Sequence, residues 1–131
     1  MSRNHWWKTT TIYQVYPLSF QDSNGDGIGD LRGIIHRLDY IASLGFETIW
    51  LSPFYISPFR DHGYDVSSYT EVDARMGTDA DIQELIDRAH TWKLRVILDM
   101  VMNHTSDQHP WFVESKSSLD SPKRNWYIWK K

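Results

Sequence analysis

Apolar and polar positions follow two different periods along this chain, and they predict strands and helices in alternation. Residues 10–16 are mostly β-branched or aromatic and end at Pro17, as a buried strand does. Residues 46–51 and 95–100 are two further apolar runs of strand length. Apolar residues at i, i+3, i+4 and i+7 predict two helices, one with Leu31, Ile34, Ile35, Leu38, Ile41, Ala42 and Leu44, the other with Ile82, Leu85, Ile86, Ala89 and Trp92.

The boundaries of these elements carry their own signals. Gly45 follows the first helix, and Thr78 with Asp81 forms a capping-box pattern before the second. The last strand is almost continuously apolar, as expected in a parallel sheet that is covered on both faces. Short loops follow the helices and long polar loops follow the strands, so functional groups are expected at the carboxyl ends of the strands.

The predicted fold class is therefore α/β, with the order β-α-β-α-β. Such a unit has an open sheet edge that needs a partner, and we interpret the chain as truncated. An independent doubly wound α/β domain is an alternative. Against it, the glycines at 25, 27 and 29 have the wrong spacing for a phosphate loop and lie among acidic residues.

Composition narrows the function classes. The 131 residues are 40% hydrophobic, 24% charged and 15% aromatic, which indicates a globular domain whose aromatic rings serve a core or a sugar site. A net charge of −3 without a basic patch argues against nucleic acid as a partner. The chain has no cysteine, and its N-terminus lacks the apolar run of a signal peptide, so a cytoplasmic protein without a membrane partner is expected.

A loop rich in Asp, Asn and Gly follows the first strand. Oxygen-bearing side chains stand at loop positions 1, 3, 5 and 9, a backbone carbonyl stands at position 7, and Gly27 permits a sharp turn. The candidate metal ligands are therefore Asp22, Asn24, Asp26, the carbonyl of Ile28, and Asp30. This spacing is typical of a hard cation such as Ca²⁺ or Mg²⁺. Position 12 is Gly33 instead of a bidentate Glu, so the loop is not an EF-hand. An ordinary Asp/Asn/Gly turn is the alternative.

Polar groups also follow the second and third strands. Tyr64 and Asp65 belong to the first of these loops, and Asn103 and His104 to the second. Because such loops are neighbours in a parallel barrel, their side chains would face one pocket. Asp99 lies in an apolar strand and must have a partner. Taken singly, Asp99 could be a structural residue tied to a turn, and His104 a structural histidine.

These stretches resemble glycoside hydrolase family 13, the α-amylase superfamily, and within it the α-glucosidase and oligo-1,6-glucosidase group. The run from Asp99 to His104 matches the family motif D-x-x-x-N-H, and residues 63–65 match G-Y-D. Residues 45–53, with 6–8, 12–17 and 103–112, are also similar to family segments. Matching segments run in order through essentially the whole chain.

The resemblance implies the first three strands of a (β/α)8 TIM barrel in residues 1–104, and in 105–131 the start of the subdomain inserted after the third strand. By resemblance, Asp65 would bond hydroxyls of the terminal glucose, Tyr64 would stack on its ring, His104 would bind an outer hydroxyl and Asp99 would brace the catalytic floor. The five loop residues would match this group's structural metal site.

No catalytic residue is expected in this chain. By resemblance, the nucleophile lies in an Arg-x-Asp on the fourth strand and the acid on the fifth, beyond Lys131. Residues Arg37 to Asp39 match the Arg-x-Asp motif but lie in a predicted helix. Arg60 and Asp61 lack the intervening residue of that motif. We expect part of a retaining glycoside hydrolase for α-glucosidic bonds of small oligosaccharides, or of a transglycosylating relative, inactive alone. A non-catalytic carbohydrate- or metal-binding half-barrel module is the alternative.

Overall fold

The computed structural model describes residues 5–130 and contains two compact units. The first unit comprises residues up to 54 together with 72–99, and the second comprises 55–71 together with 100–131. This grouping by contacts differs from the predicted division at residue 104, which stays a prediction. Residues 1–4 and residue 131 lie outside the described range. The expectation that the N-terminus is not a signal peptide therefore falls partly on residues that the structure does not describe.

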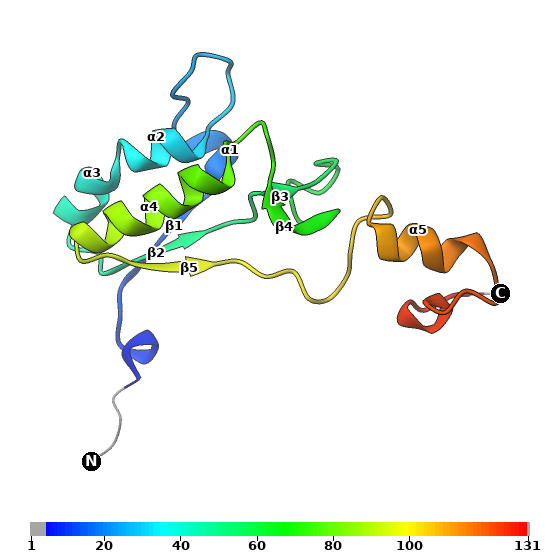
Figure 1. Cartoon of the computed structure of the whole chain (residues 1–131). Helices are drawn as coiled ribbons and strands as arrows, with labels where there is room; N and C mark the ends of the chain where they lie inside the picture. The colour runs from blue at the N-terminus through cyan, green and yellow to red at the C-terminus, as the bar shows by residue number, and fades with distance from the viewer. Residues whose placement is uncertain (1–4, 131) are drawn as a thin grey trace. The chain divides into compact units, whose positions relative to one another are not determined.

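The first unit is built on a parallel sheet in the order β1-β2-β5 (Figure 1). Its strands are β1 (Ile12–Val15), β2 (Thr48–Leu51) and β5 (Arg95–Leu98). In register, Ile12 lies beside Thr48, and Thr48 beside Arg95. All three predicted strands and their parallel arrangement are confirmed, with ends shorter than predicted.

Helices α2 (Leu31–Ile35), α3 (Leu38–Ser43) and α4 (Asp79–Thr91) lie on one side of this sheet (Figure 1). Their apolar faces bury the core, which includes Ile34, Ile41, Ile49, Leu51 and Leu85. The first predicted helix is interrupted between α2 and α3. Arg37 has φ −117° and ψ 10°, outside the helical range, yet apolar positions on both sides of the break still face the sheet.

The predicted capping box at the start of α4 is confirmed. Asp81 N donates to Thr78 Oγ1 at 3.2 Å, and Thr78 N donates to Asp81 Oδ2 at 2.9 Å. Asp81 also pairs with Arg32 at 2.8 Å, which ties α4 to α2. The hydrogen bonds from Thr78, with that ion pair, hold the pKa of Asp81 below its usual value although burial opposes them.

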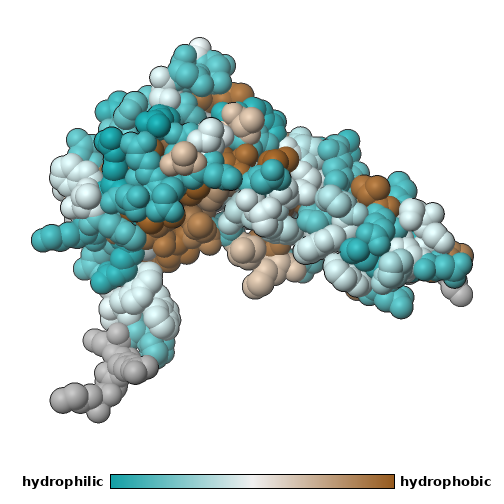
Figure 2. Space-filling model, in the orientation of Figure 1, coloured by the Kyte–Doolittle hydropathy of each residue, from teal (hydrophilic) through white to brown (hydrophobic). Residues whose placement is uncertain are grey.

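The opposite face of the sheet is only partly covered within this chain. Ile12, which shares this face with Gln14, is 42% exposed, and Gln14 is exposed as well. Figure 2 shows hydrophobic side chains gathered in the region of the strands. The expectation of a sheet covered on both faces is therefore not met by the described residues. Among the helices of residues 5–130, none is long and apolar enough to cross a membrane.

The second unit contains elements that the periodicity did not predict. Strands β3 (Tyr55–Ile56) and β4 (Ser68–Val72) form a two-stranded sheet within the segment predicted as a long loop. Helix α5 (Pro110–Ser117) and the 3₁₀ turn η2 (Arg124–Trp126) lie in the tail that has no clear period. The short elements α1 (Pro17–Phe20) and η1 (Trp6–Lys8), in the first unit, were also missed.

Side chains, more than regular secondary structure, hold α5 and the tail together. Trp111 meets Trp126 edge-on at 5.4 Å between centroids, and Phe112 stacks on Trp129 at 5.4 Å. Such aromatic contacts need no helical or strand period, which explains why the hydrophobic pattern did not reveal them.

Candidate functional site

Asp65 is held by the loop that precedes it. Its Oδ1 accepts hydrogen bonds from Ser57 Oγ at 2.8 Å and Asp61 N at 3.1 Å, and its Oδ2 accepts from Arg60 N at 2.9 Å. Burial raises the pKa of Asp65, but the bonds from Ser57, Arg60 and Asp61 outweigh it and hold the pKa below its usual value. The side chain is thus kept as a carboxylate, half-buried and fixed in direction.

The same loop contains two non-glycine residues in the left-handed region, Phe59 with φ 55° and His62 with φ 53°. This backbone conformation is costly for residues with a Cβ and tends to occur at functional sites. Three hydrogen bonds to a single carboxylate are the interactions that stabilise such a turn. The loop is therefore shaped around Asp65.

His104 lies against the Gly-Tyr-Asp stretch of the same unit. Its Nε2 is 3.1 Å from Tyr64 O, and its Nδ1 is 3.1 Å from Asn103 Nδ2. A carbonyl only accepts, so the neutral imidazole carries its proton on Nε2 and accepts from Asn103 at Nδ1. The predicted closeness of the two strand-end loops is confirmed by this contact. The sugar-binding roles of Asp65, Tyr64 and His104 stay predictions.

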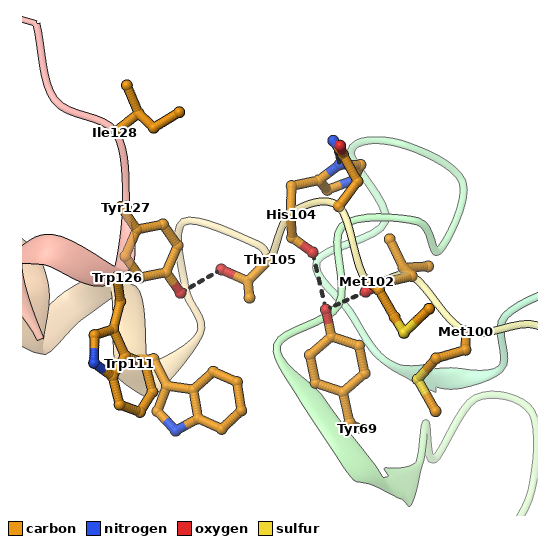
Figure 3. A pocket seen from close by; sticks show the side chains of 11 residues that line it. Tyr69, Met100, Met102, His104, Thr105, Trp111, Trp126, Tyr127 and Ile128 are labelled. Carbon is orange, nitrogen blue, oxygen red and sulfur yellow. Dashed lines mark hydrogen bonds between the residues drawn. The ribbon is translucent and has the colours of Figure 1, made fainter.

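An aromatic pocket of about 760 Å³ adjoins His104 within the second unit (Figure 3). It is lined by Tyr69, residues 100–105, Trp111, Trp126, Tyr127 and Ile128. Tyr64 and Asp65 are not among its lining residues. The single pocket expected for all the strand-end polar groups stays a prediction. The hydroxyl of Tyr127 lies 2.8 Å from Thr105 Oγ1 across one side.

Asp99 belongs to the first unit, where its carboxylate has the partner that the sequence required. Trp50 Nε1 donates to Asp99 Oδ2 at 3.3 Å, and Asp99 N donates to Leu51 O at 3.1 Å. The residue is thus fixed at the end of β5 by the neighbouring strand β2.

The Asp/Asn loop closes through its own side chains. Asp22 accepts from the backbone of Asn24, Gly25 and Gly27, and Asn24 and Asp26 each accept from the backbone N two residues ahead. Hydrogen bonds from the backbone N–H groups of Gly27 and Gly25 are the main reason why the pKa of Asp22 lies below its usual value. Burial acts in the opposite direction and is outweighed.

Asp30 has a structural task at the end of this loop. It is buried and caps α2 by accepting from Gly33 N at 2.6 Å, while its other oxygen accepts from Ser23 N and Oγ at 2.9 Å. Within residues 5–130, no three acidic or histidine side chains are gathered as a metal-binding group. The oxygen donors of the loop suit a hard cation in chemistry, and the ion stays a prediction.

Neither of the two Arg/Asp pairs set aside above forms a catalytic pair. Asp39 lies on the exposed side of α3, where its carboxylate accepts from the N–H of Tyr40. Arg60 forms a 3.5 Å ion pair with Asp107, and both side chains are mostly exposed.

Three residues of the site were missed by sequence reasoning. Ser57 is buried and bonds to Asp65, Trp50 bonds to Asp99, and Tyr69 bonds to the backbone of His104. Ser57 stands eight positions before Asp65, in a stretch without a period. The contact of Trp50 with Asp99 could have been predicted from the sequence, because both strands were predicted. Their parallel pairing places Trp50 beside Ile97, two positions before Asp99.

Comparison with known proteins identifies the family. Residues 14–131 match the family described as alpha amylase, catalytic domain. The chain is 59% identical over 124 residues to a probable alpha-glucosidase of Rhizobium meliloti (strain 1021), and 53% identical over 125 residues to an oligo-1,6-glucosidase of Heyndrickxia coagulans. Each match covers 95% of this chain and 22% of the relative.

Solved structures agree with these relatives. A mutant of MutB in complex with the substrate sucrose superposes with a TM-score of 0.94 at 47% identity, over 97% of this chain and 23% of that one. The chain thus spans somewhat less than a quarter of the length of the proteins that it matches. With a family match over nearly its whole length, this chain belongs to the alpha-amylase family, as the N-terminal portion of its catalytic domain.

Proposed function

We propose that this chain forms part of a retaining glycoside hydrolase that acts on α-glucosidic bonds of small oligosaccharides. In this proposal the chain supplies one side of the sugar site within a (β/α)8 barrel, and the remainder of the domain supplies the nucleophile and the acid. The observation that carries the proposal is the contact of His104 Nε2 with Tyr64 O, next to the preformed carboxylate of Asp65.

The chemistry of these groups suits a sugar end. Asp65 is an ionised acceptor with a fixed direction, His104 presents an exposed imidazole, and Tyr64 immediately precedes Asp65 in the sequence. A sugar hydroxyl can donate to the Asp65 carboxylate, and a hydroxyl can accept from His104 Nε2–H in place of Tyr64 O. The sugar-binding roles fall to Asp65, Tyr64 and His104, and Asp99 holds the end of β5.

A structural cation belongs to the same proposal. Asp22, Asn24, Asp26, Asp30 and the Ile28 carbonyl would hold Ca²⁺ or Mg²⁺, and the ion would tie the loop after β1 to α2. The low pKa of Asp22 supports this assignment, because a ligand carboxylate must be deprotonated.

A chimaera tests the proposed function directly. Residues 1–131 of this chain replace the matching segment of the Heyndrickxia coagulans oligo-1,6-glucosidase, and hydrolysis of an α-1,6-linked glucoside is measured. We expect an active chimaera in which Asp65→Asn lowers kcat/KM by about one to two orders of magnitude, because charged hydrogen bonds are lost in the transition state. The matched control is Asp61→Asn, an exposed carboxylate of the same loop.

The 131-residue chain alone is expected to release no p-nitrophenol from p-nitrophenyl α-glucoside. Turnover by the purified chain that disappears in Asp65→Asn would contradict the division of labour proposed here. A folded chimaera whose Asp65→Asn variant keeps full kcat/KM would contradict the sugar-binding role of Asp65.

A further inference from the structure

The hydroxyl of Tyr69 lies between two carbonyl groups of the segment that carries His104. It donates to Val101 O at 2.7 Å and to His104 O at 2.9 Å, as the dashed lines in Figure 3 show. A hydroxyl has one proton, so the two carbonyls share it in a three-centre hydrogen bond. One side chain thereby closes the turn from Val101 to His104.

Regular backbone hydrogen bonds do not support this turn. Residues 99–105 lie between β5 and α5 in irregular structure. The next backbone bond beyond the turn is from Ser106 N to Val66 O, at 2.8 Å. Met102, in the middle of the turn, is 87% exposed and so adds little packing. The position of the His104 backbone therefore depends on the Tyr69 hydroxyl.

We propose that Tyr69 is a positioning residue that holds the His104 imidazole in its orientation for the sugar hydroxyl, an inference that rests on the proposed function. The imidazole is exposed and has a single contact on each ring nitrogen. With so little packing of its own, the ring keeps its direction through these two hydrogen bonds, and both require that the backbone from which the ring projects is fixed.

Two features make Tyr69 suited to this task. The residue is half-buried, and its ring lies 5.7 Å from that of His109 and 6.5 Å from that of Trp111, so the hydroxyl is anchored from behind. Burial, with a smaller contribution from Tyr127, raises the pKa of Tyr69, so the phenol remains a donor.

A matched pair of variants in the 131-residue chain tests the inference. Tyr69→Phe removes the hydroxyl that bonds to the His104 carbonyl. Tyr127→Phe removes a hydroxyl from the same pocket whose partner is Thr105 Oγ1. The first readout is the ¹⁵N chemical shifts of the His104 ring, which report its tautomer, together with the solvent exchange of its Nε2 proton.

We expect one tautomer with a slowly exchanging Nε2 proton in the wild type and in Tyr127→Phe. In Tyr69→Phe we expect averaged shifts and faster exchange. Unchanged shifts and exchange in Tyr69→Phe would overturn the inference. Loss of the circular dichroism spectrum in that variant would overturn it too, since the hydroxyl would then support the fold and not a single side chain.

The second readout is binding of methyl α-D-glucoside to the Heyndrickxia coagulans chimaera described above, in which the sugar site is complete, followed by titration. Tyr69→Phe should weaken binding about tenfold, as loss of one oriented hydrogen-bonding group does. In a His104→Ala background the same change should have no further effect, and an undiminished effect would overturn the inference. If the chimaera with the wild-type segment binds no glucoside, the sugar-binding proposal fails, while the His104 ring shifts in the 131-residue chain still decide the role of Tyr69.

Discussion

The indole N–H of Trp50 donates to Oδ2 of Asp99 across 3.3 Å, so the carboxylate at the end of β5 is joined to the neighbouring strand β2. This bond links two residues that are 49 positions apart in the chain. It gives a half-buried carboxylate an uncharged donor, and it fixes the carboxylate at the carboxyl end of the sheet.

Removing this bond should destabilise the first unit. In a double-mutant cycle of Trp50→Phe and Asp99→Ala, we expect a coupling free energy of about 1.5–3 kcal/mol, the usual range for a hydrogen bond to a charged group. Urea unfolding followed by circular dichroism measures it. A coupling within error of zero would show that the 3.3 Å contact does not contribute to stability.

The pKa of Asp65 predicts a pH-dependent contribution to stability. Burial raises this pKa, but the hydrogen bonds from Ser57, Arg60 and Asp61 lower it by more than burial raises it. The pKa in the folded state therefore lies below the pKa in the unfolded state. The contribution is therefore fully present above the unfolded pKa of about 3.9 and is lost as the pH falls through the folded pKa.

Asp65→Asn should accordingly lower the free energy of unfolding at neutral pH, and the difference from wild type should shrink below about pH 4. Denaturant titrations over a pH series measure this difference. The control is Asp61→Asn, whose exposed carboxylate lies in the same loop. A difference that stays constant down to about pH 2 would contradict the assignment.

The loop from Asp22 to Asp30 should respond to a divalent cation. Saturating Ca²⁺ should raise the melting temperature, since a ligand at about 100 times its Kd stabilises the folded state by about 2.7 kcal/mol. Asp26→Asn should abolish the response, and Asp39→Asn, an exposed residue of α3, should retain it. Equal melting temperatures in calcium and in EDTA for the wild-type chain would contradict the metal site.

Gly33 is required for steric reasons in helix α2. A Cβ at this position would lie 2.0 Å from Gln21 O, and backbone atoms cannot move aside cheaply. On helix propensity alone, Gly33→Ala would stabilise the chain by about 1 kcal/mol. We expect the opposite sign, a loss of about 1–3 kcal/mol as in other overpacked sites.

Gly25→Ala is the matched comparison for Gly33→Ala. Gly25 has φ +84°, and a Cβ there would meet nothing within 4 Å, so only backbone strain of about 1–2 kcal/mol applies. Thermal unfolding of both variants measures the two effects. A Gly33→Ala chain more stable than wild type would show that Gln21 can move away.

The sequence by itself determined the parts of this protein that depend on local pattern. Apolar runs predicted β1, β2 and β5, the helical period predicted the face of α2, α3 and α4, and the spacing of Thr78 and Asp81 predicted a capping box. These features are local because periodicity and capping involve residues within a few positions of one another. The family also followed from the sequence, because the matching segments occur in order along the chain.

Only the tertiary structure decided which distant groups meet. Tyr69 reaches a carbonyl 35 positions away, and Ser57 orients Asp65 from an irregular segment. Strand β3 has two residues, and α5 with the tail is joined by ring contacts such as that of Phe112 with Trp129. These contacts depend on how the chain returns on itself, and no period or spacing in the sequence records that path. The hydrogen bonds that orient Asp65, and those from the Tyr69 hydroxyl to the carbonyls of Val101 and His104, were therefore found only in the tertiary structure.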